Sequence, residues 1–375
     1  MKIKILNINT IGLCREGITA TQLDFMQRLD KSRFCIRMVS AGLLDAEVVR
    51  KFTDMGCDIV SLPNRKKKLF SYFWHLCKEI REEKYDIVYV HGSSAILSIE
   101  LAAAWLCGCK NRIVHCHSTS CEHKTADRLL RPVFYKSYTQ ALACGTDAGQ
   151  WLFPGRPFQL IRNGRDVETY RFRPEKRKEL RTALGITDTT LAVGHVGNFT
   201  YAKNQGFLVQ VMKELLRMNP EAKLFLMGDG AYKGAVEQLA AENGLTGSIV
   251  FTGNISNVPD MLQAMDVMVL PSLYEGLPLV SVEWQIAALP CILSETVTKE
   301  CAYTDLVHFL SLEEPQQWAQ KILELGKFDR AAYADTAIAR TVESGFDLSG
   351  NAKQLEHLFM ERVPALNNKK EEEAQ

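Results

Sequence analysis

Short apolar stretches recur along the chain, and a longer segment with helix-like character follows each of them. The first half contains such stretches at residues 2–8, 33–40, 85–91 and 111–118, and the second half at 190–197, 222–229, 248–253 and 267–272. Alternating strands and helices define βαβ order. Strands that are apolar throughout indicate a parallel sheet with helices on both faces. The pattern therefore predicts an α/β protein with one Rossmann-like, doubly wound domain in each half.

A charge-rich segment, RNGRDVETYRFRPEKRKELRTALGITD, separates the two series of strands. A chain of 375 residues is long enough for two domains. We place the junction between Tyr170 and Asp188, and we expect an N-terminal domain over residues 1–170 and a C-terminal domain over 171–347. The end of the chain, residues 364–375, is short and highly charged, which predicts disorder.

Composition narrows the possible partners and location. The 45 Lys and Arg residues nearly balance the 44 Asp and Glu residues, so the total charge gives no reason to expect a nucleic acid partner. The N-terminus lacks the pattern of a signal peptide. The longest apolar stretch, Ala95 to Cys109, is short for a membrane span and contains Glu100, so we expect no transmembrane helix. Eleven scattered cysteines favour a reducing, cytoplasmic location.

One segment, CGCKNRIVHCHSTSCEH, is rich in cysteine and histidine and raises the question of a zinc site. It contains no C-x2-C pair. In a strand, Cys116 would point away from the face that His115 and His117 share. We therefore expect no metal ion here.

The segment LPSLYEGLPLVSVEW contains the strongest chemical signal. Pro278 stands where a helix would begin, since proline is favoured at the first helical position. The following amides, of Leu279 and Val280, would then be free donors at the positive end of a helix, which suits a diphosphate. Glu275 and Glu283 flank this position and suggest recognition of sugar hydroxyls. The alternative is that both glutamates are ordinary solvated residues.

A second segment, VGHVGNFTYAKNQGF, ends a strand and begins a helix. Asn204 is a suitable N-cap for that helix. Lys203 at the same helix start is unfavourable for the helix dipole, which favours a role as a phosphate ligand over an ordinary surface lysine. In the first half, Gly12 and Gly17 follow the first strand, where the backbone could approach a ligand.

Together these segments resemble glycosyltransferase family 4, a large retaining group with the two-domain GT-B fold, and within it the bacterial capsular and exopolysaccharide transferases. The matching motifs occur in order along nearly the whole chain: YDIVYVHGSS, RIVHCHSTS, ALACGTDAGQWLF, IRNGRDVETYRF, VGHVGNFTYAKN, LFLMGDG, FTGNISNVPDML, AMDVMVLPSLYEGLPLVSVE and ALPCILS. The resemblance implies that the two domains face a cleft, with the acceptor in the N-terminal and the nucleotide sugar in the C-terminal domain. It also implies that a helix over residues 348–363 returns to the N-terminal domain.

The resemblance also implies roles for individual residues. Glu275 would contact the hydroxyls of the donor sugar and Glu283 the ribose, while Lys203 would neutralise the leaving diphosphate. His117 would lie near the acceptor and the anomeric carbon, although a histidine at a strand end is otherwise more often a core residue. The catalytic residues would be His117, Lys203 and Glu275. The donor-binding residues would be Gly17, Asn198, Lys203, Gly253, Asn254, Val258, Glu275, Gly276, Leu279, Val280 and Glu283.

Two positions depart from the family pattern. Asn198 follows Gly197 where the family commonly has arginine, so one cation expected at the diphosphate is missing. Glu16 precedes Gly17 where the family often has a second glycine. Both departures concern contacts to the donor phosphates.

The sequence thus predicts a retaining transferase that moves a sugar from a nucleotide sugar, with a UDP-sugar expected, to a glycan or lipid-linked oligosaccharide in surface polysaccharide synthesis. No D-x-D motif follows a strand, so neither a metal ion nor another cofactor is expected. Residues 65–78 and 123–136 combine cations with aromatic side chains, which suits an anionic membrane surface at the inner face of the plasma membrane or, alternatively, ordinary amphipathic helices. Two other functions remain open: a non-catalytic sugar-nucleotide-binding subunit of another transferase, and a GT-B epimerase or phosphorylase.

Overall fold

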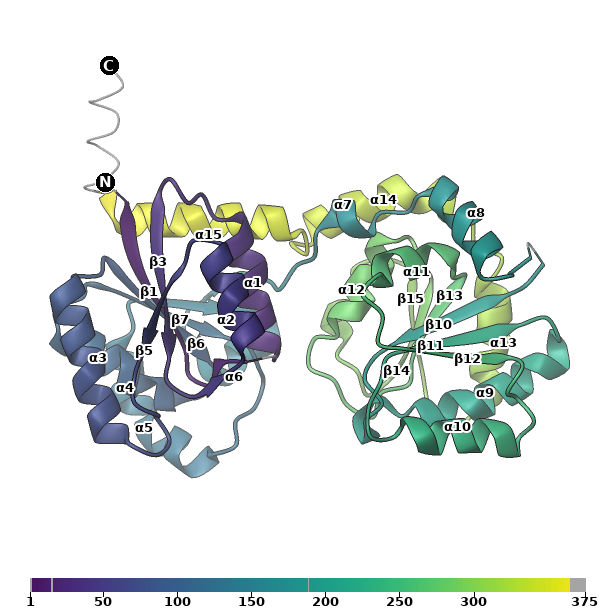
Figure 1. The fold of residues 1–375 in the computed structure, drawn as a ribbon, viewed down its shortest axis with the longest axis horizontal. Coiled ribbons are helices and arrows are strands. Elements are labelled where there is room, and N and C mark those ends of the chain that lie inside the picture. Colours follow the sequence, from purple (N-terminus) through teal and green to yellow (C-terminus); the bar gives the residue numbers. More distant parts are fainter. Residues whose placement is uncertain (1, 15, 188, 365–375) are drawn as a thin grey trace, which may run out of the picture. The chain divides into compact units, whose positions relative to one another are not determined.

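The computed structural model describes residues 2–14, 16–187 and 189–364 (Figure 1). It divides the chain into two compact units, Met1–Asn163 with Leu348–Gln375, and Gly164–Asp347. The division falls between Asn163 and Gly164 rather than between Tyr170 and Asp188. The reason is that the short helix α7 (Val167–Tyr170) contacts helices of the second unit. The predicted disorder of the C-terminal tail concerns residues that, from 365 onward, lie outside the described part of the chain.

The first unit is built on a seven-stranded sheet in the order β5-β3-β1-β6-β7-β8-β9, in which the paired strands run parallel. The strands are β1 (Ile3–Asn9), β3 (Phe34–Ser40), β5 (Asp58–Ser61), β6 (Ile87–Gly92), β7 (Asn111–Cys116), β8 (Gln140–Ala143) and β9 (Gln159–Leu160). A small parallel pair, β2 (Gly12–Leu13) and β4 (Leu43–Leu44), lies beside it.

Helices cover both faces of this sheet (Figure 1). One face carries α3 (Leu69–Glu83), η1 (Ala95–Leu97), α4 (Ser98–Leu106), α5 (Lys124–Ser137) and α6 (Thr146–Leu152). The other carries α1 (Gly17–Arg28), α2 (Ala46–Asp54) and α15 (Leu348–Arg362). Successive strand residues supply the two cores, since Ile5 packs on the second face and Leu6 on the first.

The helix α15 belongs to the first unit although it follows the second unit in sequence. It packs beside α1, and its Phe359 ring meets Tyr89 and Phe34 edge-on, with centroids 5.5 and 5.9 Å apart. Its buried Leu355 extends the same contact. The return of the chain thus completes an apolar core that the first 163 residues leave open.

The second unit repeats the architecture with a six-stranded parallel sheet in the order β12-β11-β10-β13-β14-β15. The strands are β10 (Ala192–Val196), β11 (Lys223–Met227), β12 (Ile249–Gly253), β13 (Val267–Leu270), β14 (Cys291–Ser294) and β15 (Val307–Leu310). The remaining elements are α8 (Pro174–Ala183), η2 (Tyr201–Lys203), α9 (Gln205–Met218), α10 (Lys233–Glu242), α11 (Val258–Ala264), α12 (Leu279–Ile286), η3 (Lys299–Cys301), α13 (Pro315–Leu325) and α14 (Arg330–Glu343). The predicted α/β class with doubly wound parallel sheets is confirmed in both units.

The strand order identifies where ligands would bind. In a doubly wound sheet, the crevice lies beyond the carboxyl ends of the strands where the order reverses. That point falls between β1 and β6 in the first unit, and between β10 and β13 in the second. Among the described residues, no helix combines the length and apolar content that crossing a bilayer requires.

Candidate functional site

Lys203 and Glu275 meet at the reversal point of the second unit. Lys203 ends η2, just after β10, and Glu275 lies in the loop after β13. The Lys203 Nζ donates to Glu275 Oε1 at 2.5 Å, and the buried Ser272 hydroxyl donates to the same oxygen at 2.8 Å. Both charged side chains keep about a fifth of their surface exposed, 21% and 17%. The fold therefore places a cation and a carboxylate, both predicted from sequence, at an accessible strand edge.

The side chain of Asn204 links these two loops and does not cap α9. Its backbone is left-handed, with φ 53°, and its side chain makes no hydrogen bond to the start of α9. Instead, its Nδ2 donates to the carbonyl of Pro271 at 3.2 Å. Asn204 therefore occupies the predicted N-cap position of α9 without a capping hydrogen bond, because the turn after η2 directs its amide towards the loop that follows β13.

The helix α12 begins beside this pair. Pro278 immediately precedes the helix, with φ −73°, instead of occupying its first position. No side chain caps this helix start. Among the described residues, the amides of Leu279 and Val280 have no hydrogen-bond acceptor, whereas the next amide, of Ser281, donates to the Pro278 carbonyl at 3.0 Å. Two free N–H groups at a positive helix end form a site for an anion.

Glu283 lies one turn into α12 and is buried, with 6% of its surface exposed. Its Oε1 accepts from Arg165 Nε at 2.7 Å. Arg165 precedes α7, and its backbone N–H donates to the Phe346 carbonyl at 2.9 Å, so its position is fixed from two sides. The sequence reasoning did not single out Arg165, although it lies in the motif IRNGRDVETYRF. Its charge compensates that of Glu283 inside the unit.

A pocket of about 380 Å³ opens at the end of β10. It is lined by Asn198, Phe199, Thr200, Asp229, Gly230, Ala231, Tyr232 and Asn254. The last glycine of the motif LFLMGDG, Gly230, has no room for a side chain. At its φ of 152°, a Cβ would lie 2.5 Å from the Phe199 carbonyl oxygen. The close approach of these two loops gives the pocket its floor. Two predicted donor residues, Asn198 and Asn254, thus share one pocket.

Three other predicted donor residues of this unit lie at the ends of strands and helices or in a loop. Gly253 ends β12 with φ 68°, and its carbonyl accepts from the Gly228 amide at 2.9 Å. Val258 begins α11, and Gly276 is exposed in the loop before α12.

The first unit contains the other two predicted positions, Gly17 and His117. Gly17 begins α1, but the carboxylate of Glu16 caps that helix and accepts from the amides of Thr19 and Ile18 at 2.9 and 3.1 Å. Asn9 also donates to this carboxylate at 2.9 Å. The helix start at which a donor phosphate was expected therefore already binds a carboxylate of the chain.

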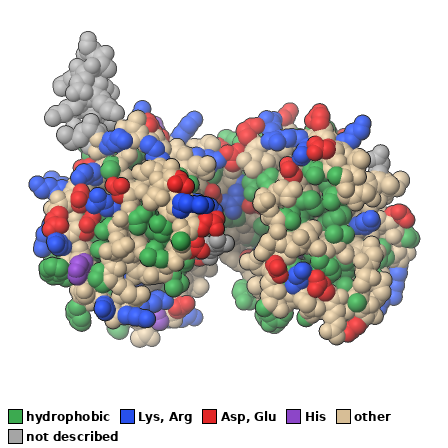
Figure 2. Space-filling model, viewed as in Figure 1, with side chains coloured by type: hydrophobic (Ala, Val, Ile, Leu, Met, Phe, Trp, Pro, Cys, Tyr) green, Lys and Arg blue, Asp and Glu red, His purple; other side chains and the backbone are tan. Residues whose placement is uncertain are grey.

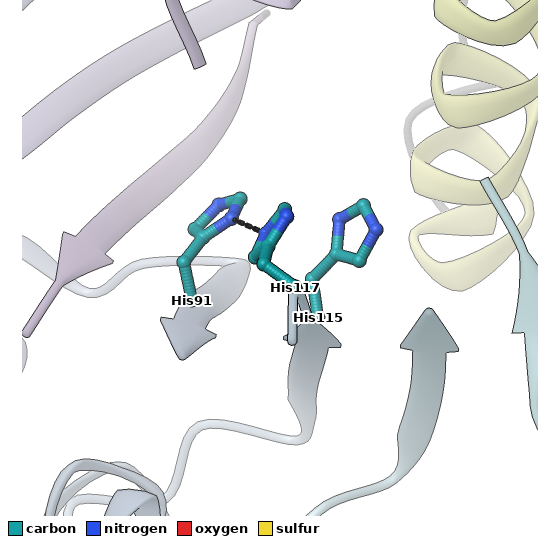
Figure 3. Close-up of side chains that lie close together, drawn as sticks. All are labelled: His91, His115 and His117. Atoms are coloured by element: carbon teal, nitrogen blue, oxygen red, sulfur yellow. Dashed lines mark hydrogen bonds between the residues drawn. The ribbon is translucent and has the colours of Figure 1, made fainter. Parts of the chain in front are cut away.

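His117 belongs to a cluster with His91 and His115 (Figure 3). The β6–β7 register sets His91 beside His115, and the alternation of β7 brings His117 to the same face. His91 Nδ1 and His117 Nε2 lie 2.9 Å apart, and the Tyr89 hydroxyl lies 2.6 Å from His115 Nδ1. Burial lowers the pKa of His117 to about 3, so its ring is neutral at ordinary pH. The sequence reasoning missed His91, for which a histidine ending the neighbouring strand was the available signal.

The two cationic-aromatic segments divide between core and surface. In α3, Tyr72 and Leu76 are buried, whereas Phe70 and Trp74 are 92% and 61% exposed. In α5, Leu129 is 73% exposed. Hydrophobic side chains lie among Lys and Arg on the visible face of the first unit (Figure 2). Each helix thus has a core face, as an ordinary amphipathic helix has, and also leaves apolar side chains in solvent.

Two doubly wound parallel units, with a lysine, a carboxylate and a free helix start at one strand edge, define the class of protein. The second unit matches the family described as Glycosyl transferases group 1 over residues 190–327. The chain is also 30% identical over 326 residues to a protein named as glycosyltransferase EpsF of Bacillus subtilis (strain 168), which covers 83% of this chain and 85% of that protein. The chain belongs to the group 1 glycosyltransferases and is a glycosyltransferase, which confirms the predicted family and enzyme class.

Two further relatives extend this result. The chain is 26% identical over 321 residues to an Escherichia coli protein named UDP-Gal:alpha-D-GlcNAc-diphosphoundecaprenol alpha-1,3-galactosyltransferase, covering 80% of this chain and 81% of that protein. The crystal structure of Anabaena HepE in complex with UDP and glucose is similar with a TM-score of 0.73 at 18% identity, covering 95% of this chain and 99% of that one. That likeness confirms the GT-B class of fold.

Proposed function

We propose that this enzyme transfers a sugar from a UDP-sugar to a glycan or lipid-linked oligosaccharide in surface polysaccharide synthesis, with retention of anomeric configuration. The observation that carries the proposal is the contact of Lys203 with Glu275 beside the free amides of Leu279 and Val280. The relatives support it: the name of the E. coli protein gives a UDP-sugar donor and a diphosphoundecaprenol-linked acceptor, and HepE was solved with UDP.

The proposed chemistry follows from where charge develops. The bond between the anomeric carbon and the diphosphate breaks while a bond to the acceptor oxygen forms, and negative charge grows on the leaving diphosphate. The α12 amides would hold its distal phosphate, and the Lys203 ammonium would move from Glu275 to the phosphate oxygens. Such preorganised donors stabilise the developing charge without a metal ion. The donor phosphate would accept the proton of the acceptor on the same face of the sugar.

The carboxylates would position the donor. Glu275, released from part of its contact with Lys203, would accept hydrogen bonds from sugar hydroxyls, while Ser272 continues to orient it. Glu283 would accept from the ribose, held in place by Arg165. The pocket that contains Asn198 and Asn254 has the size for part of a nucleotide, and these two side chains could form hydrogen bonds with it. His117 would lie near the acceptor.

Turnover with a panel of nucleotide sugars tests this function. We expect one or more UDP-sugars to raise the melting temperature and to release UDP slowly in the absence of acceptor. Nuclear magnetic resonance of the product should show the same anomeric configuration as the donor, and EDTA should leave the rate unchanged. Strict dependence on manganese or magnesium, an inverted product, or turnover with GDP-sugars alone would contradict the corresponding part of the proposal.

We also propose that the first unit docks on anionic membranes. The helices α3, α4 and α5 are neighbours in one layer. We call their exposed apolar residues the α3–α5 surface: Leu69, Phe70, Trp74, Trp105, Leu106, Leu129 and Val133. Lysines 66–68 are exposed next to it. Apolar side chains flanked by cations are typical of proteins that bind at the membrane interface.

Liposome flotation tests the docking. We expect binding to vesicles that contain anionic lipid, with loss of binding at high salt because the lysines are screened. The double change Phe70→Ser and Trp74→Ser should abolish it. Val342→Ser, at another exposed apolar position, serves as the matched control. An unaffected double variant, or no flotation at low salt, would contradict the proposal.

A further inference from the structure

Three imidazoles cluster at the reversal point of the first unit, and each has one ring nitrogen without a hydrogen-bond partner among the described residues. His91, His115 and His117 lie at the carboxyl ends of β6 and β7 (Figure 3). Three of their ring nitrogens, His91 Nε2, His115 Nε2 and His117 Nδ1, are buried and have no hydrogen-bond partner among the described residues. Buried polar atoms are almost always satisfied, so these nitrogens indicate partners such as ordered water. The nitrogens that face each other, His91 Nδ1 and His117 Nε2, are the other nitrogens of those two rings.

The geometry brings the three rings within reach of a single ion. One ring nitrogen from each histidine lies within 4.8 Å of the others. Zinc bound by imidazole has Zn–N distances of about 2.0–2.1 Å, which in a tetrahedron separates ligand nitrogens by about 3.3 Å. The His91 Nδ1 and His117 Nε2 atoms are 2.9 Å apart, so a small rotation would admit an ion between them. The coordination would replace that hydrogen bond.

One polar neighbour orients a ring of the cluster. The Tyr89 hydroxyl lies 2.6 Å from His115 Nδ1 and fixes the orientation of that ring. An oxygen partner of this kind orients most histidine ligands of metals.

We propose that His91, His115 and His117 together bind one divalent transition-metal ion of the zinc class. Three histidines with one open position are a known donor set for zinc, and imidazole nitrogen suits zinc, cobalt and nickel. His117 is the least buried of the three, so the open position faces outward from its side. The expectation of no metal in this segment considered the spacing of ligands within one strand, whereas His91 comes from the neighbouring strand.

The cysteines of the same segment do not take part. The Cys116 thiol is on the opposite side of β7, where it donates to the Ser118 carbonyl at 3.3 Å and packs in the first core. The expected orientation of Cys116, away from the histidine face, agrees with this position.

Metal binding has a consequence for the enzyme. If His117 lies near the acceptor, an ion would occupy its ring nitrogen, so zinc would inhibit transfer. This consequence rests on the proposed function, whereas binding of the ion does not. The two are separable because binding is measured without donor or acceptor.

Cobalt titration of the full-length, metal-free protein tests the site directly. We expect one equivalent of Co²⁺ to give the visible absorption of a tetrahedral complex and one equivalent of Zn²⁺ to displace it. His115→Gln should weaken Zn²⁺ binding by at least about a hundredfold. His308→Gln in the second unit and Cys121→Ser are the controls and should bind as the parent does. Unchanged UDP binding and melting temperature would show that the variants are folded.

A milder variant tests the site even if the histidine variants fail to fold. Tyr89→Phe keeps all three imidazoles and removes only the hydroxyl beside His115, and loss of such a partner typically weakens metal binding about 10- to 100-fold. Absence of stoichiometric binding would overturn the proposal and leave ordered water as the partner of these nitrogens. Binding that survives His115→Gln but disappears in Cys121→Ser would overturn it as well.

Discussion

The starts of α12 and α1 both follow a strand at the reversal point of their sheet, β13 in the second unit and β1 in the first, yet they differ in charge. The α12 start has no side-chain cap, and the amides of Leu279 and Val280 have no acceptor among the described residues. The α1 start is capped by the Glu16 carboxylate, which accepts from two amides. A positive helix end attracts an anion only while its donors are free. The comparison favours the second unit as the holder of the diphosphate.

Side-chain charge sharpens this contrast. In the second unit, Lys203 stands beside the α12 start, although the neutral Asn198 replaces the arginine of the family pattern. In the first unit, the residue at the helix start is itself an anion. In the proposed site, Lys203 would attract the diphosphate in the second unit, whereas the Glu16 carboxylate would repel an anion at the α1 start of the first unit.

The largest effect is expected from Lys203→Ala. A preorganised donor at developing charge is typically worth about 3–4 kcal/mol, so turnover should fall by roughly a hundred- to a thousandfold. The rate with saturating donor measures this loss. Lys213→Ala, an exposed lysine on the following helix, is the matched control and should retain full activity. A fully active Lys203→Ala would show that the diphosphate is held elsewhere.

The second-largest effects are expected at the two glutamates, one on turnover and the other on UDP affinity. Glu275→Ala should lower turnover by about a hundredfold with smaller effects on UDP affinity, because its contacts would be to the reacting sugar. Glu283→Ala should mainly weaken UDP binding, seen by calorimetry. Glu295→Ala, an exposed glutamate after β14, is the control. Equal losses of affinity in both variants, with turnover of bound donor unchanged, would contradict this division.

Asn198→Arg should strengthen the binding of UDP by the second unit. A charged donor is about twice as strong as a neutral one, so UDP affinity should rise by roughly tenfold, and the change should partly rescue Lys203→Ala. Because both residues would share one diphosphate, a double-mutant cycle of turnover should be non-additive. Strict additivity would mean that they do not act on the same group.

The smallest effect tests the first unit. Glu16→Ala removes a helix cap, which should lower the free energy of unfolding by about 1 kcal/mol, seen in denaturant titration. UDP affinity should stay within about twofold, because we expect no phosphate at α1. Glu16→Gln keeps a capping oxygen without the charge and is the control. A large gain in UDP affinity in both variants would contradict the contrast between the two helix starts, since it would place a phosphate at α1 as well as at α12.

The sequence by itself determined the local features of this protein. The continuous apolar strands and the helices between them follow from periodicity, which depends on neighbours a few residues apart. The free start of α12 follows from Pro278, and the identity of Lys203 and Glu275 as candidate ligands follows from their place at strand and helix ends. The predicted strands and helices are confirmed, and Lys203 and Glu275 lie together because strand ends in a parallel sheet necessarily gather at one edge.

Only the tertiary structure decided which of these residues meet. The contact of Lys203 with Glu275 spans 72 positions, and Arg165 reaches Glu283 across 118. His91 joins His115 because β6 pairs in register with β7, and Glu16 caps α1 through the direction of one side chain. Such contacts depend on strand order, register and rotamers, and each balances hydrogen bonding, burial and charge over distant parts of the chain. No local pattern of residues encodes that balance.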